Sequence, residues 1–271
     1  MSQTIFITGT STGLGRLTAR VFAERGWNVA ATMRDLGKAE EPAKFRNVKY
    51  LQLDVADVDQ VKAATADAIT AFDKVDVVVN NAGMGTFGAL ELAEESAIDW
   101  QYSVNVRGPI NIIRSFLPHF RAHRGGMFIN ISSFMGLTTA MPLASLYNMS
   151  KFALEGLTEA LYYELEPLNI DLRLIEQGGS SDNNFVRNIA WNTSETIRDY
   201  DVLTSKVKAR LETAKEGDLD DPQMIVDAIY ALATRESTQF RTVLGSTGNT
   251  LMALRHSVPI EDYLARMASA F

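Results

Sequence analysis

The chain has 271 residues, of which 46% are hydrophobic and 22% are charged, a composition that suits one α/β domain with a buried core. It contains no cysteine, which excludes a disulfide framework, a zinc-thiolate site and a cysteine nucleophile. Its formal net charge of −7 offers no basic surface for nucleic acid, so we expect no nucleic-acid partner.

A β-like apolar run starts within the first few residues, so we expect no signal peptide. No apolar segment approaches the ~18 residues that a membrane span needs, so we expect no membrane association and a cytoplasmic location. The predicted strands are 5–8, 27–33, 48–53, 75–80, 127–131, 170–176 and 240–244. Segments of helical spacing separate them, and this alternation predicts one α/β domain over residues 1–271, a parallel sheet between two helical layers.

The segments between the strands carry helix signals. Asp57 is placed as the N-cap of a helix over 57–72, and Asp221 and Pro222 begin a helix that reaches about residue 234. A long helix is expected over about 99–123. Residues 178–217 differ, because they are polar with scattered large apolar side chains; we expect a helical lid insertion there rather than sheet.

A glycine-rich loop joins the first predicted strand to the first helix. Gly9, Gly13 and Gly15 permit a tight turn and a close approach of backbone to a pyrophosphate, and the helix that follows directs its N–H groups at the phosphates. The same loop carries Thr10, Ser11 and Leu14. The alternative is an ordinary glycine-rich turn, but the order of strand, loop and helix favours a dinucleotide site.

Tyr147 and Lys151 lie four residues apart at the start of a predicted helix, and therefore on one helix face. An adjacent ammonium lowers the pKa of a phenol, so the pair could exchange a proton with a substrate oxygen near neutral pH. Alone, the pair is as well explained by a packed ring and a solvated lysine.

Further motifs follow in a fixed order. They are Asn80-Asn81-Ala82-Gly83 after the fourth strand, Val104-Asn105-Val106-Arg107-Gly108 in the long helix, and Ser133 with Gly136 after the fifth strand, Ser132 being the alternative serine. With the G-x-x-x-G-x-G loop and Tyr147-x-x-x-Lys151, this series resembles the short single-domain members of the short-chain dehydrogenase/reductase family over most of residues 1–176. Two segments, 31–35 and 241–245, resemble its 17β-hydroxysteroid and retinol dehydrogenase-like branch.

The resemblance implies a Rossmann-type doubly wound sheet of about seven strands and a hydride transfer between a nicotinamide and a carbonyl or alcohol carbon. Tyr147 would be the general acid, and Lys151 would lower its pKa and bind the nicotinamide ribose. Ser133 would polarise the substrate oxygen, and Asn105 would position a water beside Lys151. The implied cofactor-binding set also includes Asp54 and Val55 at the adenine, Asn81 along its ribose, and Ala82, Gly83 and Gly178.

The end of the second strand indicates which cofactor binds. A carboxylate there would bind the ribose 2′-hydroxyl of NAD, but Met33 occupies that position and Arg34 follows it. Because a guanidinium suits a 2′-phosphate, we predict NADP(H) over NAD(H). The alternative is that Arg34 is solvated and Asp35 binds the ribose.

The chain departs from the family pattern after the sixth strand. Gln177 replaces the usual proline, which frees the loop and adds a backbone donor, and Ser181 is a possible substitute for a missing threonine. Ser133 precedes Tyr147 by 14 residues, one more than the family implies, so we expect a bulge between them.

The substrate is expected to be a small hydrophobic ketone, aldehyde or secondary alcohol, because the residues expected around the reacting carbon are apolar. They are Met84, Phe87, Phe134, Leu137, Met141, Leu143, Phe185 and Trp191. No metal is expected, since His119 and His123 lack further ligands. A non-catalytic NADP-binding sensor or regulatory protein is the alternative function, and related proteins suggest a homodimer or homotetramer.

Overall fold

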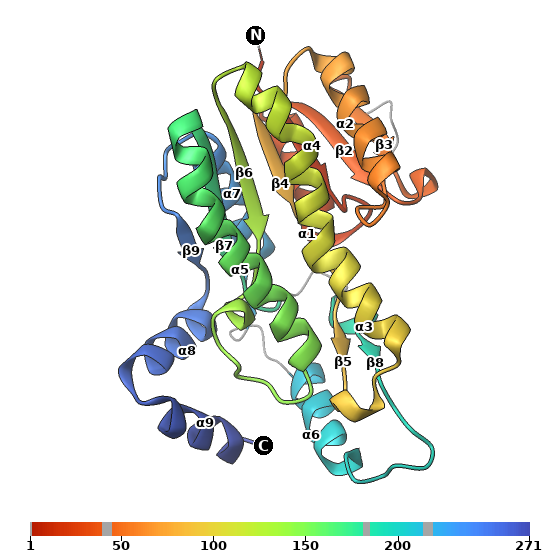
Figure 1. Cartoon of the computed structure of the whole chain (residues 1–271), viewed down its shortest axis with the longest axis vertical. Coiled ribbons are helices and arrows are strands. Elements are labelled where there is room, and N and C mark those ends of the chain that lie inside the picture. The colour runs from red at the N-terminus through yellow and green to blue at the C-terminus, as the bar shows by residue number, and fades with distance from the viewer. Residues whose placement is uncertain (1, 40–44, 181–184, 214–218) are drawn as a thin grey trace.

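The structure, a computed structural model, describes residues 2–39, 45–180, 185–213 and 219–271. Its centre is a parallel sheet of seven strands in the order β3-β2-β1-β4-β6-β7-β9 (Figure 1). The strands are β1 (Thr4–Thr8), β2 (Asn28–Met33), β3 (Val48–Gln52), β4 (Val77–Asn80), β6 (Gly126–Ile131), β7 (Ile170–Glu176) and β9 (Arg241–Val243). The predicted Rossmann-type doubly wound sheet is confirmed.

Helices cover both faces of the sheet (Figure 1). One layer is α1 (Gly13–Glu24) with α7 (Pro222–Ala233), and the other is α2 (Val58–Phe72), α4 (Gly108–Ala122) and α5 (Ser145–Leu165). Side chains alternate between the layers, so Ile5 and Ile7 of β1 pack beneath α1 and α7, while Phe6 packs beneath α2 and α4. This two-sided burial explains why the strands are almost continuously apolar.

Two helices begin where their capping residues predict. The Asp57 carboxylate accepts hydrogen bonds of 2.9 and 3.1 Å from the backbone N–H groups of Asp59 and Gln60, at the start of α2. Asp221 accepts one of 2.8 Å from Gln223 at the start of α7. Both predicted N-caps are therefore confirmed.

The long helix predicted over 99–123 starts earlier and is not uniform. It consists of α3 (Glu95–Tyr102), a π-helical turn over Ser103–Arg107, and α4. The spacing of the apolar residues does not indicate the π-helical turn, because the turn depends on contacts that Asn105 makes with a distant segment.

The remaining elements gather beyond the carboxyl ends of the strands (Figure 1). They are β5 (Thr86–Phe87), which pairs in parallel with β8 (Ala190–Trp191), and the helices α6 (Asp201–Glu212), α8 (Ser246–Ser257) and α9 (Ile260–Ser269). The expectation of helix rather than sheet in residues 178–217 is wrong at β8, where a short apolar segment finds a strand partner far away in sequence. None of the helices in the described ranges is long and apolar enough to cross a membrane.

Candidate active site

A cleft of about 600 Å³ opens beyond the carboxyl ends of β1 and β4, where the strand order reverses. Ligands of open α/β sheets bind at this switch point. Of the residues predicted at the site, those that line the cleft are Gly9, Ser11, Gly13, Leu14, Gly15, Arg34, Asp54, Val55, Asn81, Ala82, Gly83, Tyr147 and Lys151. Thr10, Asn105, Ser133 and Gly178 lie outside this lining.

Two glycines of the loop are packed too tightly to carry a side chain. Gly9 has a φ of +73°, and a Cβ there would lie 2.9 Å from the Cα of Ala82. A Cβ on Gly15 would lie 2.3 Å from the carbonyl oxygen of Gly9. Because α1 begins at Gly13, its free N–H groups and positive dipole end lie at the cleft. A loop with glycines at these crowded positions, beside a helix N-terminus, fits the pyrophosphate of a dinucleotide.

Asn81 fastens the loop to the neighbouring strand. Its amide nitrogen donates hydrogen bonds of 2.8 Å to the carbonyl of Thr8 and 3.1 Å to that of Gly9. The Thr8 hydroxyl accepts from the backbone N–H groups of Asn81 and Ala82, each at 3.0 Å. Asn81 therefore both lines the cleft and sets the shape of the loop.

Two cations border the cleft beyond β2. Arg34 and Lys38 line it, together with Asp54 and Val55 from the end of β3. The Asp35 carboxylate instead accepts a hydrogen bond of 2.9 Å from the backbone of Gly37, in its own turn, and is not part of the lining. Lys38, four residues after Arg34, was not among the predicted cofactor-binding residues.

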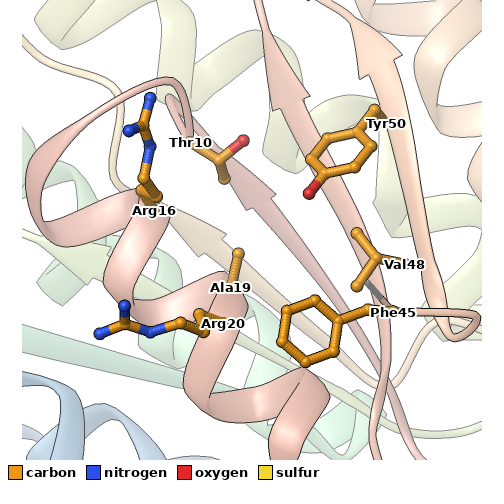
Figure 2. Close-up of a pocket in the computed structure, with 7 residues that line it drawn as sticks. All are labelled: Thr10, Arg16, Ala19, Arg20, Phe45, Val48 and Tyr50. Atoms are coloured by element: carbon orange, nitrogen blue, oxygen red, sulfur yellow. The ribbon is translucent and has the colours of Figure 1, made fainter. Parts of the chain in front are cut away.

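Thr10 faces away from the cleft. Its hydroxyl donates a hydrogen bond of 3.1 Å to the carbonyl of Thr32, and it borders a separate cavity of about 10 Å³ beside Arg20 and Tyr50 (Figure 2). Such a cavity has room for about one water molecule. Thr10 thus fastens the loop to β2, and its side chain is not placed at the predicted cofactor site.

Ser133 lies just beyond the carboxyl end of β6, and Tyr147 and Lys151 lie near the start of α5. Their three side chains converge. The Ser133 hydroxyl hydrogen-bonds the Tyr147 phenol. The Lys151 ammonium donates a hydrogen bond of 2.8 Å to the carbonyl of Ile131 and lies 5.8 Å from the centroid of the Tyr147 ring. Ser132 points elsewhere, beside Glu155, so Ser133 is the serine that faces the tyrosine.

Burial, rather than Lys151, dominates the titration of Tyr147. Burial raises the pKa of the phenol above its ordinary value, and the hydrogen bond from Ser133 offsets only part of this rise. The expected lowering of this pKa by Lys151 is therefore wrong, because the ammonium is directed at the Ile131 carbonyl and the phenol is packed among aromatic rings. Burial also lowers the pKa of Lys151 to about 8. The phenol keeps its proton at neutral pH, as a proton donor must.

Asn105 occupies the π-helical turn, and its side chain is fully engaged. Its amide nitrogen donates to the Met84 carbonyl at 2.9 Å and to the Ser150 hydroxyl at 3.1 Å, while its oxygen accepts from the Met84 N–H at 2.9 Å. A Cβ on Gly83 would lie 3.6 Å from the Asn105 oxygen and 4.0 Å from the Lys151 nitrogen. The wide turn thus brings Asn105 and Lys151 to the same glycine.

The loop after β7 is tied down without a proline. The backbone N–H of Gly178 donates a hydrogen bond of 2.6 Å to Asp220, whose own N–H donates one of 2.7 Å to the Gly179 carbonyl. The expectation that Gln177 frees the loop is therefore wrong for residues 177–180. Ser181 lies outside the described residues. The extra residue predicted before Tyr147 falls in a segment where Leu143 has a φ of +63°.

Aromatic side chains surround the Tyr147 ring. Its centroid lies 5.8 Å from that of Phe87 and 5.2 Å from that of Phe185, and Phe87 lies 5.8 Å from Trp191. Phe134 and Met141 pack in the same cluster, and Met84 lines the cleft, whereas Leu137 and Leu143 do not belong to the cluster. The predicted apolar surroundings therefore come partly from β5 and β8 and partly from neighbouring segments.

A comparison with known proteins identifies this arrangement. The family model described as short chain dehydrogenase matches residues 3–191. The chain belongs to the short-chain dehydrogenase/reductase family. It is therefore an oxidoreductase that uses a nicotinamide cofactor, and the glycine cradle at the cleft fits that cofactor.

Individual members of the family resemble the chain over different lengths. A 3-ketodihydrosphingosine reductase of Bacteroides thetaiotaomicron is 35% identical over 93% of this chain and 91% of that protein. Estradiol 17-beta-dehydrogenase 1 of Rattus norvegicus is 38% identical over 65% of this chain and 54% of that protein, in keeping with the branch resemblance. The crystal structure of a short-chain dehydrogenase from Streptomyces avermitilis has a TM-score of 0.82 at 27% identity, covering 99% of this chain and 97% of that one.

Sequence reasoning missed several groups near this short-chain dehydrogenase/reductase site. Asp220 was not singled out, because nothing local links it to a loop about 40 residues earlier. Glu155 and Glu176 were also overlooked, although both stand beside recognised motifs. Within the described residues, no group of three or more His, Cys, Asp or Glu side chains is arranged to hold a metal ion.

Proposed function

We propose that this protein transfers a hydride between NADP(H) and a hydrophobic ketone, aldehyde or secondary alcohol, with Tyr147 as general acid and base. The observation that carries the proposal is the hydrogen bond between Ser133 and Tyr147 next to Lys151, between the dinucleotide cleft and an aromatic cluster. The bound nicotinamide supplies or accepts the hydride.

The side chains have distinct proposed roles. In reduction Tyr147 gives its phenolic proton to the substrate oxygen, which Ser133 holds and polarises. Lys151 holds the ribose next to the nicotinamide. Asn105 fixes Met84 and the wide turn, so that a water can return a proton to Lys151. In oxidation the same groups act in reverse.

The preference for NADP(H) is supported by the charges at the adenosine end of the cleft. Arg34 and Lys38 both line it, and a guanidinium with a neighbouring ammonium suits a 2′-phosphate. The carboxylate that would favour NAD, Asp35, is engaged by the backbone of Gly37. Asp54 and Val55 would contact the adenine, and Gly178 would support the nicotinamide end.

The proposed substrate is a hydrophobic carbonyl compound, and the described part of the predicted lid, residues 185–213, is proposed to cover it; residues 181–184 and 214–217 lie outside the described residues. The aromatic rings of Phe87, Phe185 and Trp191 around Tyr147 support this, since a sugar would need polar partners instead. The similar 3-ketodihydrosphingosine reductase makes 3-ketodihydrosphingosine one compound to test.

We also propose a cytoplasmic homodimer or homotetramer. Helix α5 exposes Met149, Phe152 and Tyr163, with relative exposures of 44%, 43% and 74%, and such side chains are common in subunit interfaces. Light scattering after size exclusion tests the assembly, and a monomer at micromolar concentration would contradict it.

A spectrophotometric assay of NADPH consumption tests the function, with aromatic, steroidal and long-chain ketones that include 3-ketodihydrosphingosine. We expect at least one ketone to be reduced, and Tyr147→Phe to lose roughly 100-fold or more of the rate while still binding NADPH. A Tyr147→Phe variant that keeps most of its rate would overturn the general-acid role. NADPH binding without turnover of any ketone or alcohol would favour the non-catalytic sensor.

A further inference from the structure

Two buried carboxyl groups lie behind Lys151, outside the cleft. Glu155 follows Lys151 by one turn of α5, and Glu176 ends β7. Their side chains are 4% and 0% exposed, and neither lines the cleft. Carboxylates this deeply buried are normally paired with cations and hydrogen-bond donors.

A single guanidinium faces both carboxyl groups. Nε of Arg241, at the start of β9, lies 3.0 Å from Oε2 of Glu155 and 3.7 Å from Oε1 of Glu176. Its NH2 group donates a hydrogen bond of 2.8 Å to the carboxylate of Glu159, whose side chain is 57% exposed. Because 3.7 Å is too long for a hydrogen bond, Arg241 supports an ionised Glu155 far better than an ionised Glu176.

Glu176 has little other polar support, because the backbone N–H groups of Glu176 itself and of Thr242 favour its ionised form but do not offset the effect of burial. Among the described residues, neither of its carboxyl oxygens accepts a hydrogen bond, and Oε1 of Glu155 also lacks a partner. Two like charges in one buried site, with one shared cation, cannot both be compensated. A proton on one of the carboxyl groups removes the excess charge.

We propose that Glu155 and Glu176 together hold one proton at neutral pH, mainly on Glu176, and that the negative charge left on Glu155 stabilises the ammonium form of Lys151. Glu155 is thus a positioning residue that acts through Lys151, and Glu176 is a neutral carboxylic acid. Only the catalytic consequence rests on the proposed function; the protonation states do not depend on it.

The electrostatics of the cluster agree with this assignment. Burial raises the pKa of both carboxyl groups, and repulsion by Glu155 adds to the rise that brings the pKa of Glu176 to about 8. Burial lowers the pKa of Lys151 to about 8, and Glu155 opposes that change. Arg241 and the Ser132 hydroxyl, which lies beside Gly136 and Glu155, both favour the ionised form of Glu155.

The charged groups that face the pair come from two elements. Lys151 and Glu159 lie on α5 and Arg241 lies on β9, while Arg173 of β7 forms an ion pair of 2.9 Å with Asp171 instead. Arg241 and Glu159 also border a groove of about 500 Å³ on the surface. The groove thus lies on the far side of Arg241 from the two buried carboxyl groups, neither of which lines it.

Carbon-13 NMR of the whole protein, labelled at glutamate Cδ and lysine Cε and titrated between about pH 5 and 10, tests the proposal without an activity assay. Glu176→Gln and Lys151→Arg assign the two signals. We expect the Glu176 carboxyl to titrate near pH 8. Glu155→Gln is expected to lower the midpoints of both Lys151 and Glu176, because it removes one attraction and one repulsion.

Glu159→Gln is the matched control, since it also removes a carboxylate from Arg241 but at the surface; it is expected to leave the Lys151 midpoint in place. Glu155→Asp keeps the charge and is expected to restore that midpoint at least in part. A Glu176 signal that titrates in the ordinary range of ~4 to 5 would overturn the shared proton. An unchanged Lys151 midpoint in Glu155→Gln would overturn its positioning role. The wild-type titration of Glu176 decides the first question even if a variant fails to fold.

Discussion

The backbone N–H of Gly178 donates a hydrogen bond of 2.6 Å to the carboxylate of Asp220, 42 residues later in the chain. Gly245, with a φ of +69°, packs against the same carboxylate so closely that a Cβ there would lie 1.8 Å from its Oδ1. Asp220 thereby joins the loop after β7 to the loop after β9. It supplies by a side chain the restraint that a proline would supply by its ring.

Asp220→Ala is expected to destabilise the protein by about 1–3 kcal/mol, because the partly buried N–H of Gly178 loses its partner. The affinity for NADPH is expected to fall as well, since Gly178 supports the nicotinamide end in the proposed complex. Thermal unfolding and NADPH fluorescence titration measure the two effects. Asp221→Ala is the matched control: it removes the N-cap of α7, costs about 1 kcal/mol, and should leave the affinity for NADPH unchanged.

Arg34→Ala is expected to weaken NADPH binding by roughly 10- to 100-fold, which corresponds to one lost charge-assisted contact, and to leave NADH binding almost unchanged. Lys38→Ala should act in the same direction with a smaller effect. Direct binding titrations with both dinucleotides measure the ratio.

Arg20→Ala serves as the control for this pair, because Arg20 borders the small cavity behind Thr10 and not the cleft (Figure 2). Should Arg20→Ala change the NADPH to NADH ratio as much as Arg34→Ala, the assignment of the 2′-phosphate site would be wrong.

Asn105→Ala removes three hydrogen bonds from a side chain that is 2% exposed and leaves the Met84 N–H without its partner. We expect a loss of about 1–3 kcal/mol in stability and a fall in kcat that is larger than any change in the KM for NADPH. Ser115→Ala removes one hydrogen bond between α4 and α2 and should affect stability alone. Equal kcat values for the wild type and Asn105→Ala would remove Asn105 from the proposed proton path.

Glu176→Gln should change how stability depends on pH. The pKa of Glu176 rises from 4.5 to about 8 on folding, so the folded protein holds the proton more tightly and wild-type stability falls as pH rises through that range. The slope from this group approaches about 1.4 kcal/mol per pH unit. The glutamine cannot ionise, so the variant is expected to gain stability relative to the wild type from about pH 5 to pH 8.

The titration of Lys151 does not affect this comparison below about pH 8. Its pKa falls from 10.5 to about 8 on folding, so it makes stability rise with pH only above about pH 8. Thermal unfolding between about pH 5 and pH 8 therefore isolates Glu176. Parallel stability curves for the two proteins over this range would show that Glu176 is ionised in the folded state.

Local sequence patterns are sufficient to predict the architecture and the order of the functional motifs. Strands that are apolar on both faces, separated by helices with clear caps at Asp57 and Asp221, specify a doubly wound parallel sheet, because each signal is local and strong. The glycine spacing from Gly9 to Gly15 and the spacing of Tyr147 and Lys151 are equally local. They indicated the cleft and the reacting groups before any contact was known.

The pKa values and the local geometry of these groups depend on the tertiary structure. The pKa of Tyr147 depends on desolvation by rings from β5 and the segment near β8, and no local pattern reports desolvation. The wide turn at Asn105 depends on Met84, and the loop after β7 depends on Asp220. Glu155 and Glu176 meet only when α5 packs on β7 beside Arg241. Burial and long-range contacts set these properties, because the free energy of a charge depends on what surrounds it in space.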